Sequence, residues 1–203
     1  MQLFCNSVCL LCDDQRIARK MFMQNSNLVE LFSRFDHVES QFCIVINRSS
    51  RRAYIRYFFT AISRLGDGVF WYTLALCLPY LNGNIGWLQA LHVFATGLVG
   101  LLIYKFLKQR LVRERPYIHS NVIHQAAPAL DQYSFPSGHT LHAVLFSVLL
   151  SSYIPELSSL IWGFTCLVAL SRVVLGLHYP SDVLAGMIIG FAIATLSSNF
   201  LII

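Results

Sequence analysis

The chain has 203 residues, of which 56% are hydrophobic and only 12% are charged. Soluble domains carry about 25% charged residues, so this composition excludes an ordinary soluble enzyme and indicates a protein embedded in a membrane. The net charge of +5 comes from clustered basic residues: nine of the fifteen Lys and Arg lie within residues 1–64, and five lie within residues 105–115. Such segregation of charge is typical of membrane proteins.

The hydrophobic pattern predicts the elements in chain order. Residues 1–35 are expected to form a peripheral N-terminal tail, and residues 36–203 a single membrane-embedded domain. Residues 54–65 mix aromatic side chains with Arg56 and Arg64, which favours an amphipathic helix at the membrane interface over a sixth span. Five apolar segments follow, at residues 69–81, 85–107, 139–154, 157–175 and 183–203.

These apolar segments differ in length. A transmembrane helix needs about 20 apolar residues, so the second, fourth and fifth segments fit directly, while the first and third need flanking residues. The sequence therefore predicts an all-α integral-membrane bundle of five to six transmembrane helices. Residues 82–86 and 153–158 would connect the helices on one face, and residues 108–136 and 172–181 on the other. We call this second face the motif face, because it carries nearly all of the chemically useful residues.

Three short motifs occur in order on the motif face. Residues 108–116 read KQRLVRERP, residues 136–139 read PSGH, and residues 171–182 read SRVVLGLHYPSD. Together they resemble the signature of the type-2 phosphatidic acid phosphatase superfamily, which includes lipid phosphate phosphatases, undecaprenyl-pyrophosphate phosphatases and the soluble vanadium haloperoxidases. The resemblance covers roughly residues 35–200 and implies the phosphatase-superfamily core.

The residue types in these motifs suit phosphoryl transfer. A phosphoryl group in transit spreads negative charge over three oxygens, which Lys108, Arg115 and Arg172 can neutralise. Ser137 and Gly138 begin an apolar helix, and the free N–H groups at a helix N-terminus favour an anion. These five residues are the predicted phosphate-binding set.

The resemblance assigns the catalytic roles to two histidines and an aspartate. His178 is the expected nucleophile, forming a phosphohistidine, and Asp182 four residues later would accept the other ring N–H and orient the ring. His139 would protonate the departing oxygen and later activate water, a contribution worth about 10²–10⁴ in rate. The predicted catalytic residues are therefore His178, His139 and Asp182.

Other charged and polar residues near the motifs receive structural interpretations. Arg110 and Arg113 are interpreted as arginines that extend from a helix end to the membrane surface. His142, one turn after His139, is expected to have a packing role, and His92 is expected to be a hydrogen-bonded histidine within a span.

The acidic residues argue against a metal site. Two-metal phosphatases need several clustered carboxylates, whereas beyond the first span the motif face holds only Glu114, Asp131 and Asp182. We expect a metal-independent enzyme without a cofactor. Its expected partner is a lipid phosphate substrate, with no nucleic acid and no obligate protein partner.

The sequence thus predicts a membrane phosphatase that hydrolyses a lipid phosphate or pyrophosphate through a phosphohistidine. Undecaprenyl pyrophosphate, phosphatidic acid and phosphatidylglycerophosphate are candidate substrates, and isoprenoid pyrophosphates rank first because they suit the small members that the chain resembles. Alternatives are a lipid phosphotransferase that uses the same site and a non-catalytic lipid-binding membrane protein. A haloperoxidase is disfavoured by the apolar composition.

The expected location is the bacterial cytoplasmic (inner) membrane. The resemblance implies an active site at the outer face. With five spans, however, the basic N-terminal third shares the motif face, and the positive-inside rule would place that face in the cytoplasm. A sixth span through residues 54–65 would remove this conflict.

Overall fold

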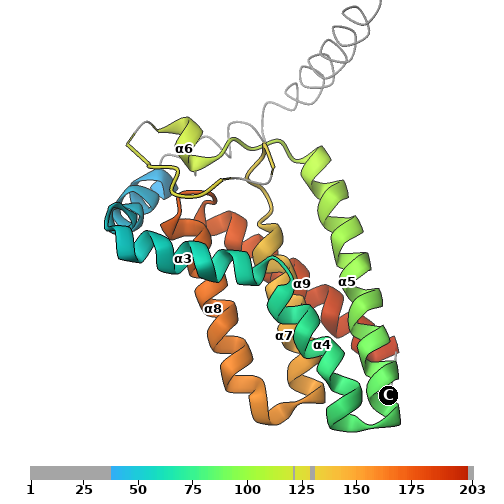
Figure 1. Ribbon diagram of the computed structural model, residues 1–203. Helices are drawn as coiled ribbons and strands as arrows, with labels where there is room; N and C mark the ends of the chain where they lie inside the picture. The colour runs from blue at the N-terminus through green and yellow to red at the C-terminus, as the bar shows by residue number, and fades with distance from the viewer. Residues whose placement is uncertain (1–37, 121, 129–130, 201–203) are drawn as a thin grey trace, which may run out of the picture. The chain divides into compact units, whose positions relative to one another are not determined.

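The computed structural model describes residues 38–120, 122–128 and 131–200, and every structural statement below concerns these residues. They form helices and no strands (Figure 1). In chain order these are a helix over residues 38–47, η1 (Arg48–Arg51), α3 (Ala53–Gly66), α4 (Val69–Asn82), α5 (Asn84–Arg110), α6 (Pro116–His119), α7 (Gly138–Tyr153), η2 (Pro155–Leu157), α8 (Ser158–Val174) and α9 (Pro180–Phe200). The all-α prediction is confirmed. The tail predicted for residues 1–35 lies outside the described residues.

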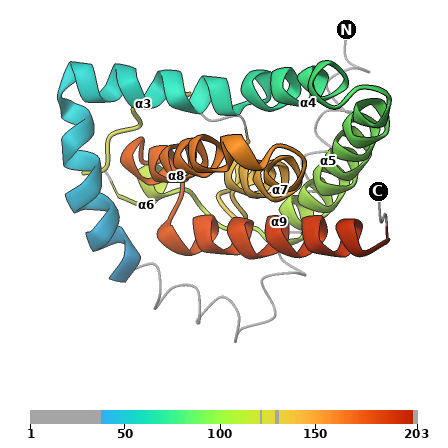
Figure 2. The same ribbon diagram turned by 90° about the horizontal axis from the view of Figure 1, so that it is seen from below.

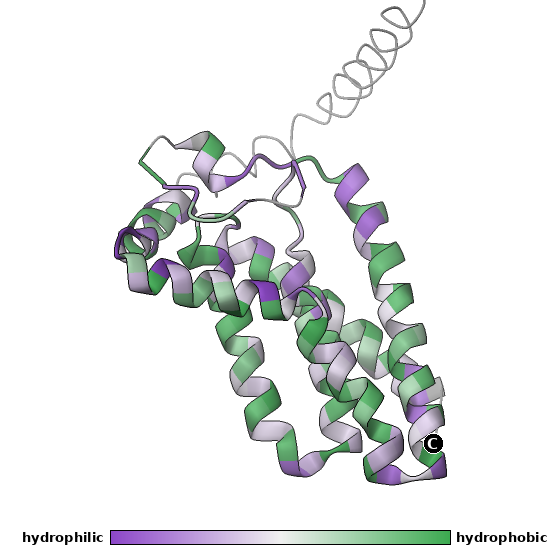
Figure 3. Cartoon of the chain, in the orientation of Figure 1, coloured by the Kyte–Doolittle hydropathy of each residue, from purple (hydrophilic) through white to green (hydrophobic). Residues whose placement is uncertain are grey.

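Three stretches are long and apolar enough to cross a membrane. They are Asn84–Arg110, Pro155–Val174 and Pro180–Asn199, while Val69–Asn82 is a shorter apolar helix. Hydrophobic residues run along α4, α5 and α8, and hydrophilic residues gather at the helix ends and on the connections (Figure 3). The predicted membrane-embedded helical bundle is therefore confirmed.

Helix α7 forms the centre of the bundle. Figure 2 shows α7 and α8 between the α3–α4 row and α9, with α5 at one end. The leucines of α7 are almost fully buried, and α9 packs closely on it, since a Cβ atom at Gly186 would lie only 2.6 Å from the carbonyl oxygen of Ser137. This close approach places the first turns of α7 and α9 together, where Ser137 N–H donates to the Asp182 carbonyl oxygen at 3.0 Å.

Helix α3 begins and ends at the motif face. Before it, the Asn47 side chain donates to the carbonyl oxygens of His124 and Val174, both at 3.0 Å. After it, Asp67 is paired with His139 at the start of α7. Since both ends contact the motif face, α3 runs along that face, across the direction of α8 (Figure 1). These contacts favour the interfacial interpretation of residues 54–65, in which the five predicted spans would correspond to α4, α5, α7, α8 and α9.

Candidate active site

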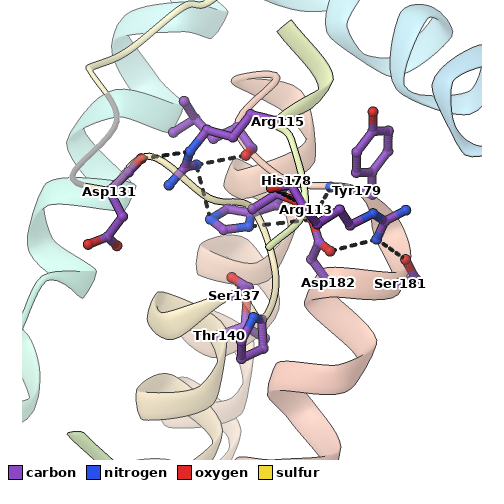
Figure 4. A network of polar contacts seen from close by, with 12 residues as sticks. Arg113, Arg115, Asp131, Ser137, Thr140, His178, Tyr179, Ser181 and Asp182 are labelled. Atoms are coloured by element: carbon purple, nitrogen blue, oxygen red, sulfur yellow. Dashed lines mark hydrogen bonds and ion pairs between the residues drawn. The ribbon is translucent and has the colours of Figure 1, made fainter. Parts of the chain in front are cut away.

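The ends of four helices bring the predicted site residues to one place on the motif face. Lys108 lies in the last turn of α5 and Arg172 in the last turn of α8, and the other residues lie on the connections or in the first turns of α7 and α9. All eight predicted residues belong to the described part of the chain: Lys108, Arg115, Ser137, Gly138, His139, Arg172, His178 and Asp182. Figure 4 shows the ring of His178 between Arg115 and Asp182, with Ser137 on a neighbouring turn.

His178 lies in the short connection between α8 and α9 and is 2% exposed. Its Nε2 atom lies 3.4 Å from Nη1 of Arg115. A guanidinium can only donate, so Nε2 is the acceptor and the ring proton belongs on Nδ1. Burial, and then the positive charges of Arg172, Arg115 and Lys108, hold the pKa of His178 well below its usual range. The ring is therefore neutral at pH 7, with the lone pair of Nε2 directed toward Arg115.

Asp182 is held in place by groups other than His178. Its Oδ1 atom lies 2.6 Å from Nη1 of Arg113, and its Oδ2 atom accepts the backbone N–H of Tyr179 at 2.9 Å. The distance from Oδ2 to Nδ1 of His178 is 3.7 Å, and Nδ1 has no hydrogen-bond partner among the described residues. The structure thus brings the two residues together without a hydrogen bond. The predicted orienting role of Asp182 stays a prediction.

The interpretation of Arg113 as a surface arginine is wrong. Helix α5 ends at Arg110, and Arg113 lies in the following connection, which folds over the first turn of α9. Arg113 is 4% exposed, its Nη2 lies 2.6 Å from Oε2 of Glu39, and its guanidinium lies 4.1 Å from the centroid of the Tyr179 ring. It is therefore a buried structural cation. Arg110 is exposed beside Phe106, as predicted.

Arg115 and Lys108 are oriented by backbone carbonyl groups. Arg115, 1% exposed, donates from Nε to the carbonyl of Asp131 at 2.9 Å and from Nη1 to that of Leu177 at 2.8 Å. Nζ of Lys108 lies 3.5 Å from the carbonyl oxygen of Pro136 and 3.7 Å from Oδ2 of Asp131. Carbonyl groups fix a cation without cancelling its charge, so Arg115 keeps its capacity to bind an anion, while the charge of Lys108 is partly balanced by Asp131.

Arg172 is a buried cation with unused donor capacity. It is 3% exposed, and its Nη1 donates to Oγ of Ser63 on α3. Its Nε atom has no hydrogen-bond partner among the described residues. A buried charged donor without a partner is costly, and a bound anion would relieve that cost.

The PSGH motif begins α7 as predicted. Oγ of Ser137 lies 2.9 Å from Oγ1 of Thr140, within the first turn of the helix. Gly138 is required by close packing, because a Cβ atom there would lie 2.7 Å from the ring of Tyr104 on α5. No contact in the structure tests the predicted binding of phosphate by Ser137 and Gly138, so this role stays a prediction.

His139 has a partner that the sequence motifs do not contain. Its Nε2 atom is paired with Oδ1 of Asp67, in the turn between α3 and α4. His142, one turn later, bonds through Nδ1 to the carbonyl oxygen of Gly138 at 2.9 Å. The Asp67–Gly68 dipeptide predicts a turn, but nothing in the sequence indicates which histidine the turn would meet.

The helix over residues 38–47 also contributes to the site. Oε1 of Glu39 accepts the backbone N–H of Ser181 at 2.9 Å, so this carboxylate caps the first turn of α9 while it pairs with Arg113. Sequence reasoning missed Glu39, because its partners follow it by more than seventy residues. The predicted hydrogen-bonded role of His92 is confirmed by contacts with Tyr153 Oη at 2.5 Å and Ser197 Oγ at 2.6 Å.

The donor set of the site suits an anion. Within residues 38–120, 122–128 and 131–200, no three His, Cys, Asp or Glu side chains converge as a metal-ligand group. Buried cations surround His178 instead, with Arg115, Lys108 and Arg172 all contributing positive charge to its surroundings. The geometry fits a phosphate group bound beside Nε2.

Known proteins share this arrangement of sequence and fold. The chain is 29% identical over 130 residues to the undecaprenyl-diphosphatase BcrC of Bacillus subtilis, which covers 64% of this chain and 67% of that protein. Its fold is similar to the crystal structure of Aquifex aeolicus LpxE, with a TM-score of 0.67, 22% identity, and coverage of 78% of this chain and 93% of that one.

A second solved structure is a transmembrane PAP2-type phosphatidylglycerolphosphate phosphatase from Bacillus subtilis. The TM-score is 0.57 at 22% identity, with coverage of 85% of this chain and 94% of that one. Together with the apolar helices, these likenesses confirm the predicted class of membrane lipid phosphatase. The model of the PAP2 superfamily matches residues 89–201, more than half of the chain, and the chain therefore belongs to the PAP2 superfamily.

Proposed function

We propose that the protein hydrolyses a lipid phosphate or pyrophosphate at the membrane surface through a phosphohistidine on His178. The observation that carries this proposal is the state of His178: a buried, neutral ring whose Nε2 accepts from Arg115. Nucleophilic attack requires a neutral nitrogen with an unprotonated lone pair, which Nε2 presents once an anion takes over the N–H groups of Arg115, and the surrounding cations suit the charge on the transferred phosphoryl group.

In the first step, Nε2 of His178 attacks the phosphorus atom, and the bond from phosphorus to the leaving oxygen breaks. His139 donates its proton to that oxygen, so the leaving group departs protonated. The ring of His178 moves so that Nδ1 approaches Asp182 from the present distance of 3.7 Å, and the carboxylate stabilises the positive ring. Lys108, Arg115, Arg172, Ser137 and the Gly138 amide bind the phosphoryl oxygens.

In the second step, water attacks the phosphohistidine. His139, now neutral, takes a proton from that water, the bond from Nε2 to phosphorus breaks, and inorganic phosphate leaves. The enzyme returns to its starting state with neutral His178 and protonated His139. No metal ion takes part in either step.

Phosphate release by purified protein in detergent tests this proposal. We expect His178→Gln to abolish release, and chelation of divalent cations to leave the wild-type rate unchanged. Equal rates for the wild type and His178→Gln would disprove the role of His178, and complete loss of wild-type activity with chelator would disprove the metal-free mechanism. Lys105→Gln, at an exposed lysine one turn before Lys108, is the matched control.

The substrate is proposed as a lipid carrying a terminal phosphate or pyrophosphate. The names of the similar proteins, an undecaprenyl-diphosphatase and a phosphatidylglycerolphosphate phosphatase, support both kinds of headgroup. A phosphotransferase would pass the phosphoryl group to a second lipid. Release of one inorganic phosphate for each substrate consumed distinguishes hydrolysis from that alternative.

We propose the bacterial cytoplasmic membrane as the location, with the active site at its outer face, as the family resemblance implies. The arginines of η1 and α3 lie on the motif face with the site, so the positive-inside rule on its own favours a site on the cytoplasmic side of the membrane. Reaction of a Gln125→Cys variant with a membrane-impermeant thiol reagent in whole cells tests the proposed side. Reaction only after the cells are opened would place the site in the cytoplasm.

A further inference from the structure

A pocket of about 250 Å³ lies beside His139, between the α3–α4 turn, α5 and α7. Its polar end is formed by Asp67, Asp131 and His139. The other walls are mainly aromatic or aliphatic and include Trp71, Tyr72, Leu101 and Phe146. The described residues that line the pocket include His139, the expected acid, and do not include His178, the expected nucleophile. The pocket is therefore adjacent to the acid side of the reaction.

The direction of phosphoryl transfer places the leaving group in this pocket. The attacking and leaving atoms lie roughly in line on opposite sides of phosphorus. If His178 attacks and His139 donates the proton, the leaving oxygen lies next to the ring of His139. Nε2 of that ring is paired with Asp67, so a leaving oxygen that takes its proton comes beside the Asp67 carboxylate.

The polar end of the pocket carries negative charge. The side chains of Asp67 and Asp131 are 38% and 41% exposed. Asp131 is partly balanced by Lys108 Nζ at 3.7 Å and accepts a hydrogen bond from Tyr104. The described residues that line the pocket include no lysine or arginine. A second phosphate placed here would meet these two carboxylates, whose charges are offset only in part by Lys108 and, from outside the pocket lining, by Arg172.

We infer that this pocket receives the leaving group, and that Asp67 and Asp131 select a lipid phosphate monoester over a lipid diphosphate. In both reactions the bond from Nε2 of His178 to phosphorus forms, and the bond from phosphorus to the leaving oxygen breaks as His139 gives up its proton. The monoester leaves a neutral alcohol, whose chain fits the apolar walls. The diphosphate leaves a lipid monophosphate that keeps a charge of about −1 beside two carboxylates even after it has taken the proton of His139.

This inference rests on the proposed function and narrows its substrate class to lipid phosphate monoesters. It also reverses the order suggested by the sequence, which ranked isoprenoid pyrophosphates first. Neither aspartate lies in the three motifs that carry the family resemblance, and Asp67 lies outside the residues that match the family model. The selectivity is therefore assigned to the α3–α4 turn, which holds Asp67, and to the α6–α7 connection, which holds Asp131.

The test compares farnesyl monophosphate with farnesyl diphosphate, which share one lipid chain, as substrates of the full-length protein in detergent. We expect kcat/KM of the wild type to be higher for the monophosphate by about tenfold or more, since like-charge contacts discriminate strongly at short range. Asp67→Asn and Asp131→Asn remove charge while keeping shape, and each should shift the ratio toward the diphosphate. Glu156→Gln, at an exposed carboxylate in η2, should leave the ratio unchanged.

A merely structural role for the aspartates would lower both rates together, whereas a selective role changes their ratio. A wild-type preference for the diphosphate would overturn the inference without any variant. So would a ratio that stays constant in active Asp67→Asn and Asp131→Asn proteins. Absence of wild-type activity on both substrates would instead overturn the proposed function, and this inference with it.

Discussion

Arg113, and not His178, makes the close contact with Asp182: Nη1 of Arg113 lies 2.6 Å from Oδ1, whereas Nδ1 of His178 lies 3.7 Å from Oδ2. The same guanidinium reaches Glu39, so one buried cation joins the helix over residues 38–47 to the first turn of α9. Asp182 is thereby fixed before any substrate binds. A small movement of the His178 ring would bring its N–H within hydrogen-bond distance of a carboxylate that is already positioned.

Replacing Arg113 should unfold this junction. Arg113→Gln leaves the carboxylates of Glu39 and Asp182 buried without their cation, and breaking a buried ion pair by removing one partner costs about 3–5 kcal/mol. We expect a lower thermal midpoint in detergent and loss of phosphate release. The matched control is Arg110→Gln, at the exposed arginine one turn earlier, which should change neither. Equal midpoints for the two variants would contradict the structural role of Arg113.

The buried state of His178 makes stability depend on pH. Its pKa is depressed in the folded protein, mainly by burial and then by the cations around it, so the unfolded chain binds the proton first as the pH falls. Stability should therefore decrease below about pH 6.5, the usual histidine value, and be unaffected by this group above it. Thermal midpoints at pH 5.5 and 7.5 measure the effect. His178→Gln should lose less stability between these two values than the wild type does; an equal loss would assign the pH dependence to other groups.

The sequence predicted most of the residues that converge at the candidate site, because they lie in short motifs at helix ends. Lys108, Arg115 and Arg172 are basic residues beside apolar runs, and His178 with Asp182 has the spacing of a single helical turn. Hydrophobic patterns also predicted the helices, since a membrane restricts a chain to continuous apolar segments.

The remaining residues reach the site from elements with no motif. Asp67, Ser63 and Glu39 come from the α3 region and the helix before it, and their partners are contacts of the folded chain. Arg113 was misinterpreted for a related reason. The sequence suggested a continuous helix end, whereas α5 stops at Arg110 and the chain turns inward.

Lysine should not substitute for Arg115 in catalysis. The Nε and Nη1 atoms of this arginine donate to two carbonyl oxygens, and Nη1 also faces His178. The single ammonium of lysine does not reproduce this geometry. We expect Arg115→Lys to lower kcat by about 10²-fold, as removal of one transition-state donor does in other enzymes. Initial rates at saturating substrate measure this. A variant with full kcat and only a raised KM would show that Arg115 contributes to ground-state binding alone.

Asn47 should be important for stability although it forms no hydrogen bond with a predicted phosphate-binding side chain. Its side chain donates to the carbonyl oxygens of His124 and Val174 and accepts the N–H of His124 at 2.8 Å. Asn47→Ala removes all three contacts and should cost about 2–4 kcal/mol, because partly buried backbone groups lose their partners. Thermal unfolding in detergent tests this. Arg48→Ala, at the exposed neighbouring residue, should leave the midpoint unchanged, and similar midpoints for both variants would contradict the prediction.

The path of α3 predicts a topology that does not depend on which side of the membrane the site faces. Because α3 starts and ends at the motif face, residues before it and residues in the α6–α7 connection should lie on one side. In a cysteine-free background, Arg51→Cys and Gln125→Cys should react together with a membrane-impermeant thiol reagent. Gly83→Cys and Glu156→Cys, in the connections at the other ends of the helices, should react only from the opposite side. Reaction of Arg51→Cys together with Gly83→Cys would mean that α3 crosses the membrane, and would restore the six-span arrangement in which the basic segment and the site are separated.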